Sequence, residues 1–134
     1  MGAWSGEPFG NDTAADWAWE LDDQRDWQIV QTALDEVVNA SEYIDGDIAS
    51  NAIAAAEAVA HGLGRATQDD AYTESVTAFV ARAPRPSDEM VQLALVALAA
   101  ASGPHSELTE LWAESGEPDW ANANARIKQA LTGS

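Results

Sequence analysis

Carboxylates at regular spacing are the first residues in this chain that could carry chemistry. Six acids occur between residues 12 and 26: Asp12, Asp16, Glu20, Asp22, Asp23 and Asp26. The first three recur every four residues, so a helix would place them on one face. Stacked carboxylates bind hard cations such as Ca²⁺ and Mg²⁺. Neither this run nor Asp45-Gly46-Asp47 has the spacing of the EF-hand calcium loop, however. We therefore interpret both as helix caps and solvated charge, and we predict no metal site.

Glu57 and His61 are the second pair that could hold a metal, since they stand four residues apart. Di-metal sites in helical bundles use Glu and His three residues apart, together with glutamates from other helices. That spacing and its repetition are both missing here. We predict instead a partly exposed His61 that interacts favourably with the carboxyl end of its helix, and no cofactor.

Nucleophilic chemistry has little support in the sequence. The chain has no cysteine and no serine in a Gly-x-Ser-x-Gly elbow. The segment Gly62-Leu63-Gly64 is too short for a dinucleotide-binding loop, and no strand precedes it. We assign no catalytic residue and expect a protein that is not an enzyme. The enzymatic alternative is a divalent-metal-dependent reaction that uses the amino-terminal carboxylates.

Two aromatic residues, Trp4 and Phe9, stand in a segment (residues 1–11) that is rich in glycine and contains Pro8. This composition is typical of a loop. Its aromatic rings could either pack on the body of the protein as a latch or be presented to a ligand as a binding lip. We favour the latch, because aromatic side chains bury large areas and dominate small cores. Burial of either ring would contribute on the order of 2–4 kcal/mol.

The opening segment also carries a resemblance to a known family. Residues 2–21 read G-A-W-S-G-E-P-F-G-N-D-T-A-A-D-W-A-W-E-L, and residues 106–112 read S-E-L-T-E-L-W. These segments resemble a G-x-W-x-G-x-x-F-x-N-D-x-A-x-D-W opening and an S-E-L-x-x-L-W segment of a bacterial family, domain of unknown function 4259. The resemblance implies a bacterial protein whose single domain spans the chain. It implies no activity, cofactor or catalytic residue.

The charge of the chain limits its partners. There are 23 acids and 6 bases, which give a net charge of -17. Residues 1–60 hold thirteen of the acids and one base, Arg25. Direct binding to nucleic acid is excluded, because affinity for phosphate backbones comes from Lys and Arg. A basic protein partner fits this charge, and Asp22, Asp23 and Asp26 are the candidate contacts. Alternatively, the acidity serves only solubility.

Apolar periodicity of the helical kind predicts an all-α fold, a compact bundle of about six or seven helices in one domain over residues 1–134. The predicted helices cover about 12–22, 23–40, 47–62 or 47–64, 67–83, 88–102, a short stretch around 108–112, and a last one that contains Trp120, Ile127 and Leu131. The helix near 88–102 is apolar on almost every side, so we predict that it is the centre of the bundle. The alanines of the third helix predict close helix–helix approach.

The sequence therefore predicts a non-enzymatic, helical, protein-binding module, comparable by analogy to antitoxins and immunity proteins. The alternative is a structural or housekeeping domain without a specific partner. No basic start precedes an apolar segment, and no apolar run approaches the ~20 residues that span a bilayer. We expect a cytoplasmic protein that does not bind membranes.

Overall fold

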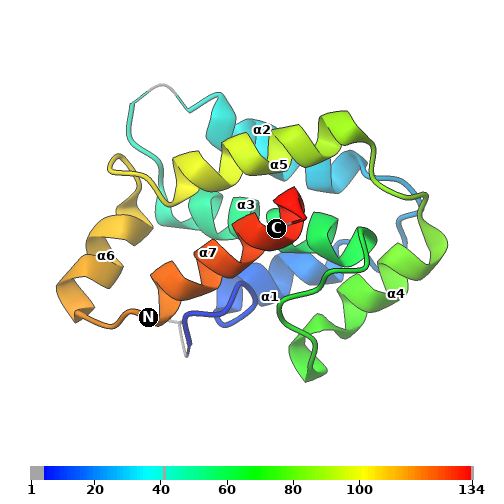
Figure 1. Cartoon of the computed structure of the whole chain (residues 1–134), viewed down its shortest axis with the longest axis horizontal. Helices are drawn as coiled ribbons and strands as arrows, with labels where there is room; N and C mark the ends of the chain where they lie inside the picture. The colour runs from blue at the N-terminus through cyan, green and yellow to red at the C-terminus, as the bar shows by residue number, and fades with distance from the viewer. Residues whose placement is uncertain (1–4, 41, 134) are drawn as a thin grey trace.

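The computed structural model describes residues 5–40 and 42–133, and its regular structure is helical (Figure 1). The elements are α1 (Asp12–Trp19), α2 (Gln28–Val38), α3 (Gly46–Gly62), the 3-10 helix η1 (Ala71–Thr73), α4 (Glu74–Arg82), α5 (Asp88–Ala101), α6 (Glu107–Ser115) and α7 (Asp119–Thr132). These residues contain no β-sheet, although an isolated bridge joins Ile44 to Ser106. The all-α prediction is confirmed.

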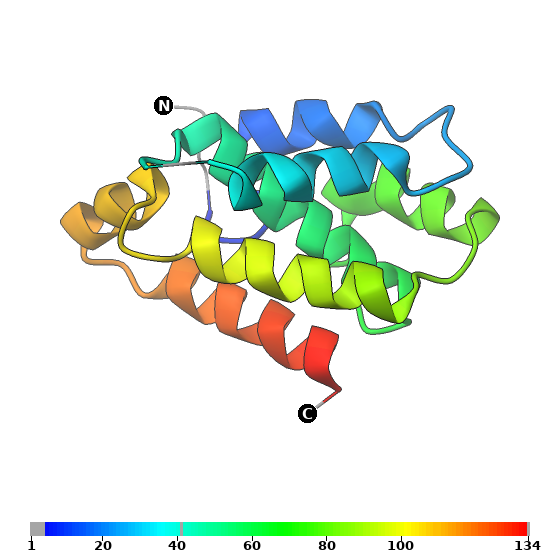
Figure 2. The same cartoon turned by 90° about the horizontal axis from the view of Figure 1, so that it is seen from above.

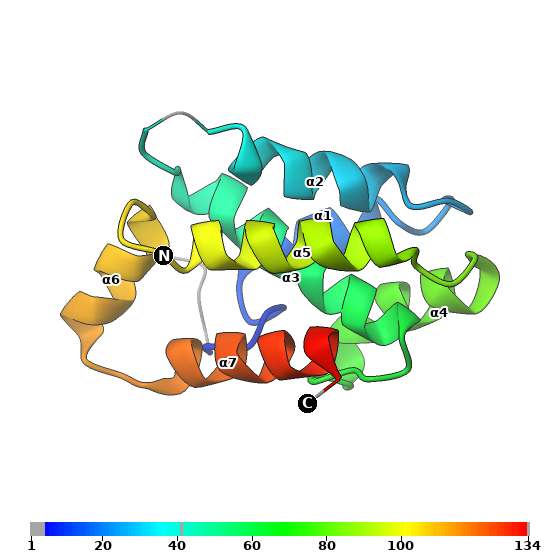
Figure 3. The same ribbon diagram turned by 45° about the horizontal axis from the view of Figure 1, so that its top comes forward.

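Helix α3 is the centre of the bundle. It contacts each of the other six α-helices. In Figure 1 it runs between α2 and α5 on one side and α1 and α7 on the other, and in Figure 3 α5 crosses in front of it. Its seven alanines are all buried, and Ala55 has no exposed surface. Small side chains let neighbouring backbones approach closely, as the sequence predicted for this helix. Most of its stability must come from this packing rather than from intrinsic propensity.

The predicted helix near 88–102 is present as α5, but it does not lie at the centre. It packs on α2, α3 and α7 and leaves one face to solvent, where Val96 is 55 % exposed. Its buried side is made of Met90 and Leu98 with intervening alanines. The apolar composition of a helix thus indicates how much apolar surface is available for burial. The number of helices packed around it determines how much of that surface is buried.

The turn between α1 and α2 differs from the prediction. The second helix begins at Gln28 rather than near Asp23, because residues 20–27 form a turn held by Arg82 of α4. The guanidinium of Arg82 donates to the carbonyl oxygens of Leu21, Asp22 and Gln24, at 2.6 Å for the last two. A charged group that satisfies three carbonyls fixes this turn outside any helix.

The loop before α4 also departs from the prediction. Instead of a helix from residues 67–70 onward, residues 63–70 form a loop that leads into η1. The Asp70 side chain accepts from the Tyr72 N–H, and the Thr73 hydroxyl accepts from the Asp70 N–H, so η1 begins with a capping box.

The amino-terminal loop packs on the bundle. Phe9 has no exposed surface and belongs to the hydrophobic core, as expected of a latch. Gly6 lies so close to α7 that a Cβ atom there would stand 2.5 Å from the Trp120 nitrogen, so only glycine fits. Asn11 then caps α1 by accepting from the Ala14 N–H at 2.8 Å. Trp4, the other predicted latch residue, lies outside the described residues.

Candidate functional site

The structure gathers the three predicted binding acids on one exposed turn. Asp22, Asp23 and Asp26 are all solvent-exposed between α1 and α2. Next to them, at the end of α1, Trp19 is 68 % exposed, which the sequence reasoning missed. The exposed base Arg25 shares the turn, and Arg82 is bonded to its carbonyls. These two cations offset part of the negative charge. Phe9, in contrast, is buried in the core and is not available to an external ligand.

A separate cavity of about 560 Å³ lies at the opposite end of α1. This volume is in the range of about 300–1,000 Å³ that is typical of ligand pockets. Five segments contribute to it: the amino-terminal loop, the first turn of α1, the first half of α3, helix α6 and the start of α7. Its lining residues are Ser5, Glu7, Pro8, Asn11, Asp12, Thr13, Asp45, Gly46, Asp47, Ser50, Ile53, Glu107, Leu108, Leu111, Trp112, Ser115 and Trp120.

Backbone pairing and one side chain fix α6 against the start of α3. Ile44 donates its N–H to the His105 carbonyl, and Glu107 donates its N–H to the Ile44 carbonyl, both at 2.9 Å. The Glu107 carboxylate also accepts from the Gly46 N–H at 2.7 Å. A Cβ atom on Gly46 would stand 2.9 Å from that carboxylate oxygen. The glycine therefore permits the contact that joins the two walls of the cavity.

Two tryptophans form the aromatic wall of the cavity. The rings of Trp112 and Trp120 are parallel, with an interplanar angle of 2° and centroids 6.4 Å apart. This separation lies within the range of favourable aromatic pairs. Trp120 is buried and Trp112 is half-buried, while Leu111 beside them is 37 % exposed. No residue of α6 is fully buried; Leu108 and Trp112 pack against the hydrophobic core and also line the cavity.

The electrostatics of the cavity are strongly negative. Five of its lining residues are acids, listed here together: Glu7, Asp12, Asp45, Asp47 and Glu107. No Lys, Arg or His is found among the described lining residues. Arg126 pairs with Glu7 at 3.0 Å, and the amino-termini of α1, α3, α6 and α7, which all border the cavity, add about +0.5 charge each. These positive contributions offset about three of the five carboxylates, which leaves about two uncompensated.

A second, shallower hollow lies beside the first and shares Glu107 and Leu111 with it. Tyr43 lines this hollow and donates its hydroxyl to Glu110 at 2.7 Å. The hydrogen bond to Glu110, with smaller contributions from desolvation and the surrounding acids, raises the pKa of Tyr43 from 10.0 to about 12. The neutral phenol is therefore the form that the acidic surface favours.

This raised pKa gives a testable pH dependence. In a Tyr72→Phe background, where Tyr43 is the remaining tyrosine, ultraviolet absorbance is expected to show phenolate formation near pH 12 rather than near pH 10. Because the folded pKa is raised, the contribution of the Tyr43 hydroxyl to stability is full below pH 10 and is lost as the pH rises through about 12. Glu110→Gln should move the titration towards pH 10. The same titration with and without Glu110 would contradict the assignment.

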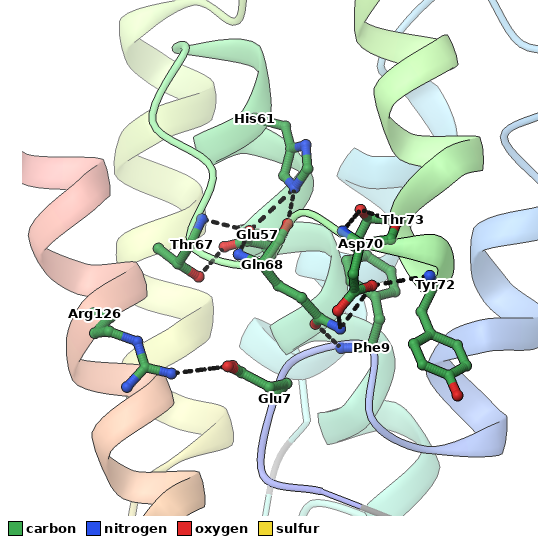
Figure 4. A network of polar contacts seen from close by, with 10 residues as sticks. All are labelled: Glu7, Phe9, Glu57, His61, Thr67, Gln68, Asp70, Tyr72, Thr73 and Arg126. Carbon is green, nitrogen blue, oxygen red and sulfur yellow. Dashed lines mark hydrogen bonds and ion pairs between the residues drawn. The ribbon is translucent and has the colours of Figure 1, made fainter.

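A buried polar network connects α3 to the loops around it (Figure 4). Glu57 has no exposed surface. Its carboxylate accepts from the N–H groups of Thr67 and Gln68, both at 2.8 Å, and from the Thr67 hydroxyl at 2.7 Å. The Nε2 atom of His61 lies 3.1 Å from Glu57 and 2.9 Å from the Gln68 carbonyl oxygen. Both neighbours are acceptors, so we assign the hydrogen to Nε2.

This network corrects the prediction for His61 and positions the amino-terminal loop. His61 is buried rather than partly exposed, because the 63–70 loop folds over it. The Gln68 side chain donates to Asp70 and accepts from the Phe9 N–H at 2.9 Å (Figure 4). Through Gln68, the buried Glu57 holds the loop that supplies Ser5, Glu7 and Pro8 to the cavity. These hydrogen bonds give Glu57 a structural role. The described residues contain no group of three or more His, Cys, Asp or Glu side chains that could hold a metal ion.

Comparison with known proteins identifies the family. The model of the family described as Domain of unknown function (DUF4259) matches residues 2–123 of the chain. The chain belongs to the DUF4259 family. No curated protein and no solved structure shows a significant match. None of the described helices is long and apolar enough to cross a membrane.

The two segments that resemble the DUF4259 family meet at the cavity. The opening segment contributes six residues to the lining, among them Asn11 and Asp12, and the second segment contributes four, among them Glu107 and Trp112. Elsewhere in the opening segment, Phe9 and Trp17 are buried, whereas Asp16, Trp19 and Glu20 are exposed. The cavity is the place where residues of both family-like segments lie together.

Proposed function

We propose that this protein is a non-enzymatic binding module that docks a basic segment of a partner protein in the acidic cavity. One observation carries the proposal: the cavity combines five carboxylates with walls of leucine and tryptophan, and its described lining contains no base. Interfaces of this kind place apolar anchors at their centre and charges around them. The net charge of -17 also steers basic partners towards the protein.

The same geometry disfavours an anionic ligand. The amino-termini of α1 and α3 both border the cavity, and helix amino-termini are common anion sites. Here the carboxylates of Asp12, Asp45 and Asp47 already stand at these positions. A phosphate or carboxylate ligand would meet the like charge of the carboxylates that the helix amino-termini leave uncompensated. This argument supports a cationic partner and opposes nucleic acid.

The neighbouring hollow supports a protein segment over a small ligand. It continues the acidic surface from Glu107 to Glu110 and Glu114 along α6. Leu111, shared by both hollows, separates them. A peptide that crosses α6 would bury this leucine and place basic side chains on both sides of it, whereas a compact ligand would use one hollow only.

A different role is proposed for the exposed turn that carries Asp22, Asp23 and Asp26. It lies at the other end of the molecule from α6 (Figure 2), and neither of the two hollows includes it. Exposed charges act over about 10 Å at 0.1 M salt. We propose that the turn accelerates encounter with a basic partner, while the cavity provides the contacts that keep it bound.

Charge-neutralising variants test this division. The probe is a fluorescently labelled peptide that alternates glycine and arginine, and the readouts are its dissociation constant and association rate. Asp12→Asn with Asp47→Asn is expected to weaken binding about tenfold, mainly through faster dissociation, because close charge pairs are lost. Asn retains the acceptor oxygen through which Asp47 binds the Thr13 hydroxyl. Raising the salt concentration to about 1 M should weaken binding of the original protein further.

The control is the triple change of Asp22, Asp23 and Asp26 to Asn, which removes more charge at the distant turn. It should slow association about twofold or less and leave dissociation unchanged. If the triple variant instead loses more affinity than the cavity variant, the docking site is the turn. Absence of any saturable, salt-dependent binding would favour the alternative, a domain whose acidity serves solubility.

A further inference from the structure

We infer that the cavity recognises an arginine side chain in particular, with its guanidinium over Trp112 and its N–H groups on the carboxylates of Asp45, Asp47 and Glu107. This inference rests on the proposed function, because it names the anchor residue of the basic partner. Three features of the cavity carry it: the state of its carboxylates, the shape of its aromatic wall and the apolar surface below them.

Three carboxylates of the cavity are each oriented by a hydrogen bond to one of their two oxygens. One oxygen of Asp45 accepts from the Asp47 N–H at 2.8 Å, and one oxygen of Asp47 accepts from the Thr13 hydroxyl at 3.1 Å. One oxygen of Glu107 accepts from the Gly46 N–H. Asp45 and Asp47 are solvent-exposed and Glu107 is half-buried, so the second oxygen of each carboxylate is accessible to a ligand in the cavity. The cavity thus offers accessible acceptor atoms from two elements, each on a carboxylate that is oriented by another hydrogen bond.

Fixed acceptors on several sides suit a guanidinium better than an ammonium. A guanidinium carries five N–H donors in a planar fork, whereas an ammonium carries three donors around one point. Arginine can therefore contact carboxylates of α3 and α6 at the same time. Because the acceptors are already positioned by their other hydrogen bonds, little side-chain freedom is lost when the guanidinium binds.

The aromatic wall adds a second preference for arginine. Trp112 is half-buried, and its ring is parallel to that of Trp120, which also lines the cavity. A planar guanidinium stacks on an indole face more favourably than a compact, strongly hydrated ammonium. Ile53 and Leu108 supply apolar surface for the aliphatic part of the side chain. Charge, planarity and an apolar stem are together the properties of arginine.

Peptide series separate this inference from the proposed function. The probes are the glycine–arginine peptide, its lysine counterpart of equal charge, and its citrulline counterpart, which keeps the arginine shape but is neutral. Isothermal titration calorimetry is expected to show binding of the lysine peptide about three- to tenfold weaker than that of the arginine peptide. The citrulline peptide should bind at least about tenfold more weakly than the arginine peptide.

Variants of the aromatic wall assign the preference to the cavity. Trp112→Leu should bring the arginine and lysine peptides to within about twofold of each other. Trp112→Phe keeps an aromatic face and should retain part of the preference, so it also serves if the leucine variant fails to fold. Trp19→Leu, at the exposed end of α1, is the matched control and should leave the ratio between the two peptides unchanged.

The outcomes are distinct. Equal binding of the arginine and lysine peptides to the original protein overturns the inference but leaves the proposed function intact. An arginine preference that survives Trp112→Leu, or that disappears in Trp19→Leu, also overturns it, because the preference then arises elsewhere. If none of the three peptides binds, the proposed function itself fails.

Discussion

Ala55→Asp is expected to prevent folding of the chain. Ala55 lies in the middle of α3 with no exposed surface, and α3 contacts all of the other α-helices. A carboxylate at this position would lose its hydration without gaining a partner, which costs more than the 5–15 kcal/mol by which domains of this kind are typically stable. Circular dichroism should show loss of helical signal, and urea should produce no cooperative transition.

Val96→Asp in α5 is the matched control. Val96 is 55 % exposed in the helix whose composition is the more apolar of the two. The same new charge should cost less than about 1 kcal/mol there, mainly through the lower helix propensity of aspartate. If the two variants had the opposite ranking, α5 would be the centre of the bundle and α3 would lie at its surface.

The difference between α3 and α5 shows what helix patterns in a sequence contain. Cap residues lie at the helix starts: Ser87 accepts from the Met90 N–H and caps α5, and the Asp45 carboxylate caps α3, which begins at Gly46 rather than at the predicted residue 47. These contacts lie within a few residues, so the sequence contains them. Which helix is central depends on how many neighbours surround it. The alanines of α3 give only a weak apolar pattern in the sequence, so they do not indicate how deeply the helix is buried. Their small side chains nevertheless allow other helices to pack against it on every side.

The cavity shows why the candidate site could not be predicted from spacing. Asp12, Asp45, Glu107 and Trp120 come from four segments, and their proximity depends on the pairing of Ile44 with the segment before α6. Two of them have a local explanation that indicates no site: Asp45 is a helix cap, and Glu107 is an acid in the first turn of α6. The resemblance to a known family was the stronger signal, because it marked the Asn11-Asp12 and Glu107–Trp112 segments that meet at the cavity.

Glu57 was a missed signal of another kind. It stands in the run Ala54-Ala55-Ala56-Glu57-Ala58, so it is a single charge within an otherwise apolar segment. Its four-residue spacing from His61 suggested a comparison with metal ligands. When that comparison failed, His61 was predicted to be partly exposed. Its partners Thr67 and Gln68 lie in a loop ten and eleven residues later. A lone acid on a helix that buries every side indicates donors that come from elsewhere in the fold.

Glu57→Leu is therefore expected to destabilise the protein by about 3–5 kcal/mol, because it leaves the Thr67 and Gln68 N–H groups and the Thr67 hydroxyl without their acceptor in the interior. Leucine fills similar space, so the loss reports hydrogen bonding rather than a cavity. Glu57→Gln should cost less, about 1–2 kcal/mol. Its amide oxygen can accept from both N–H groups if its NH2 group donates to the Thr67 hydroxyl, which can rotate to accept.

Urea denaturation of the two variants measures these losses, and amide hydrogen exchange shows where they act. In the leucine variant, the N–H groups of Thr67, Gln68 and Phe9 should lose protection together, since Gln68 transmits the change to the amino-terminal loop. Glu36→Gln, on the exposed side of α2, is the control and should shift stability by no more than about 0.5 kcal/mol. If Glu57→Leu were as stable as the original protein and Phe9 remained protected, the buried carboxylate would not be what holds the loops beside the cavity.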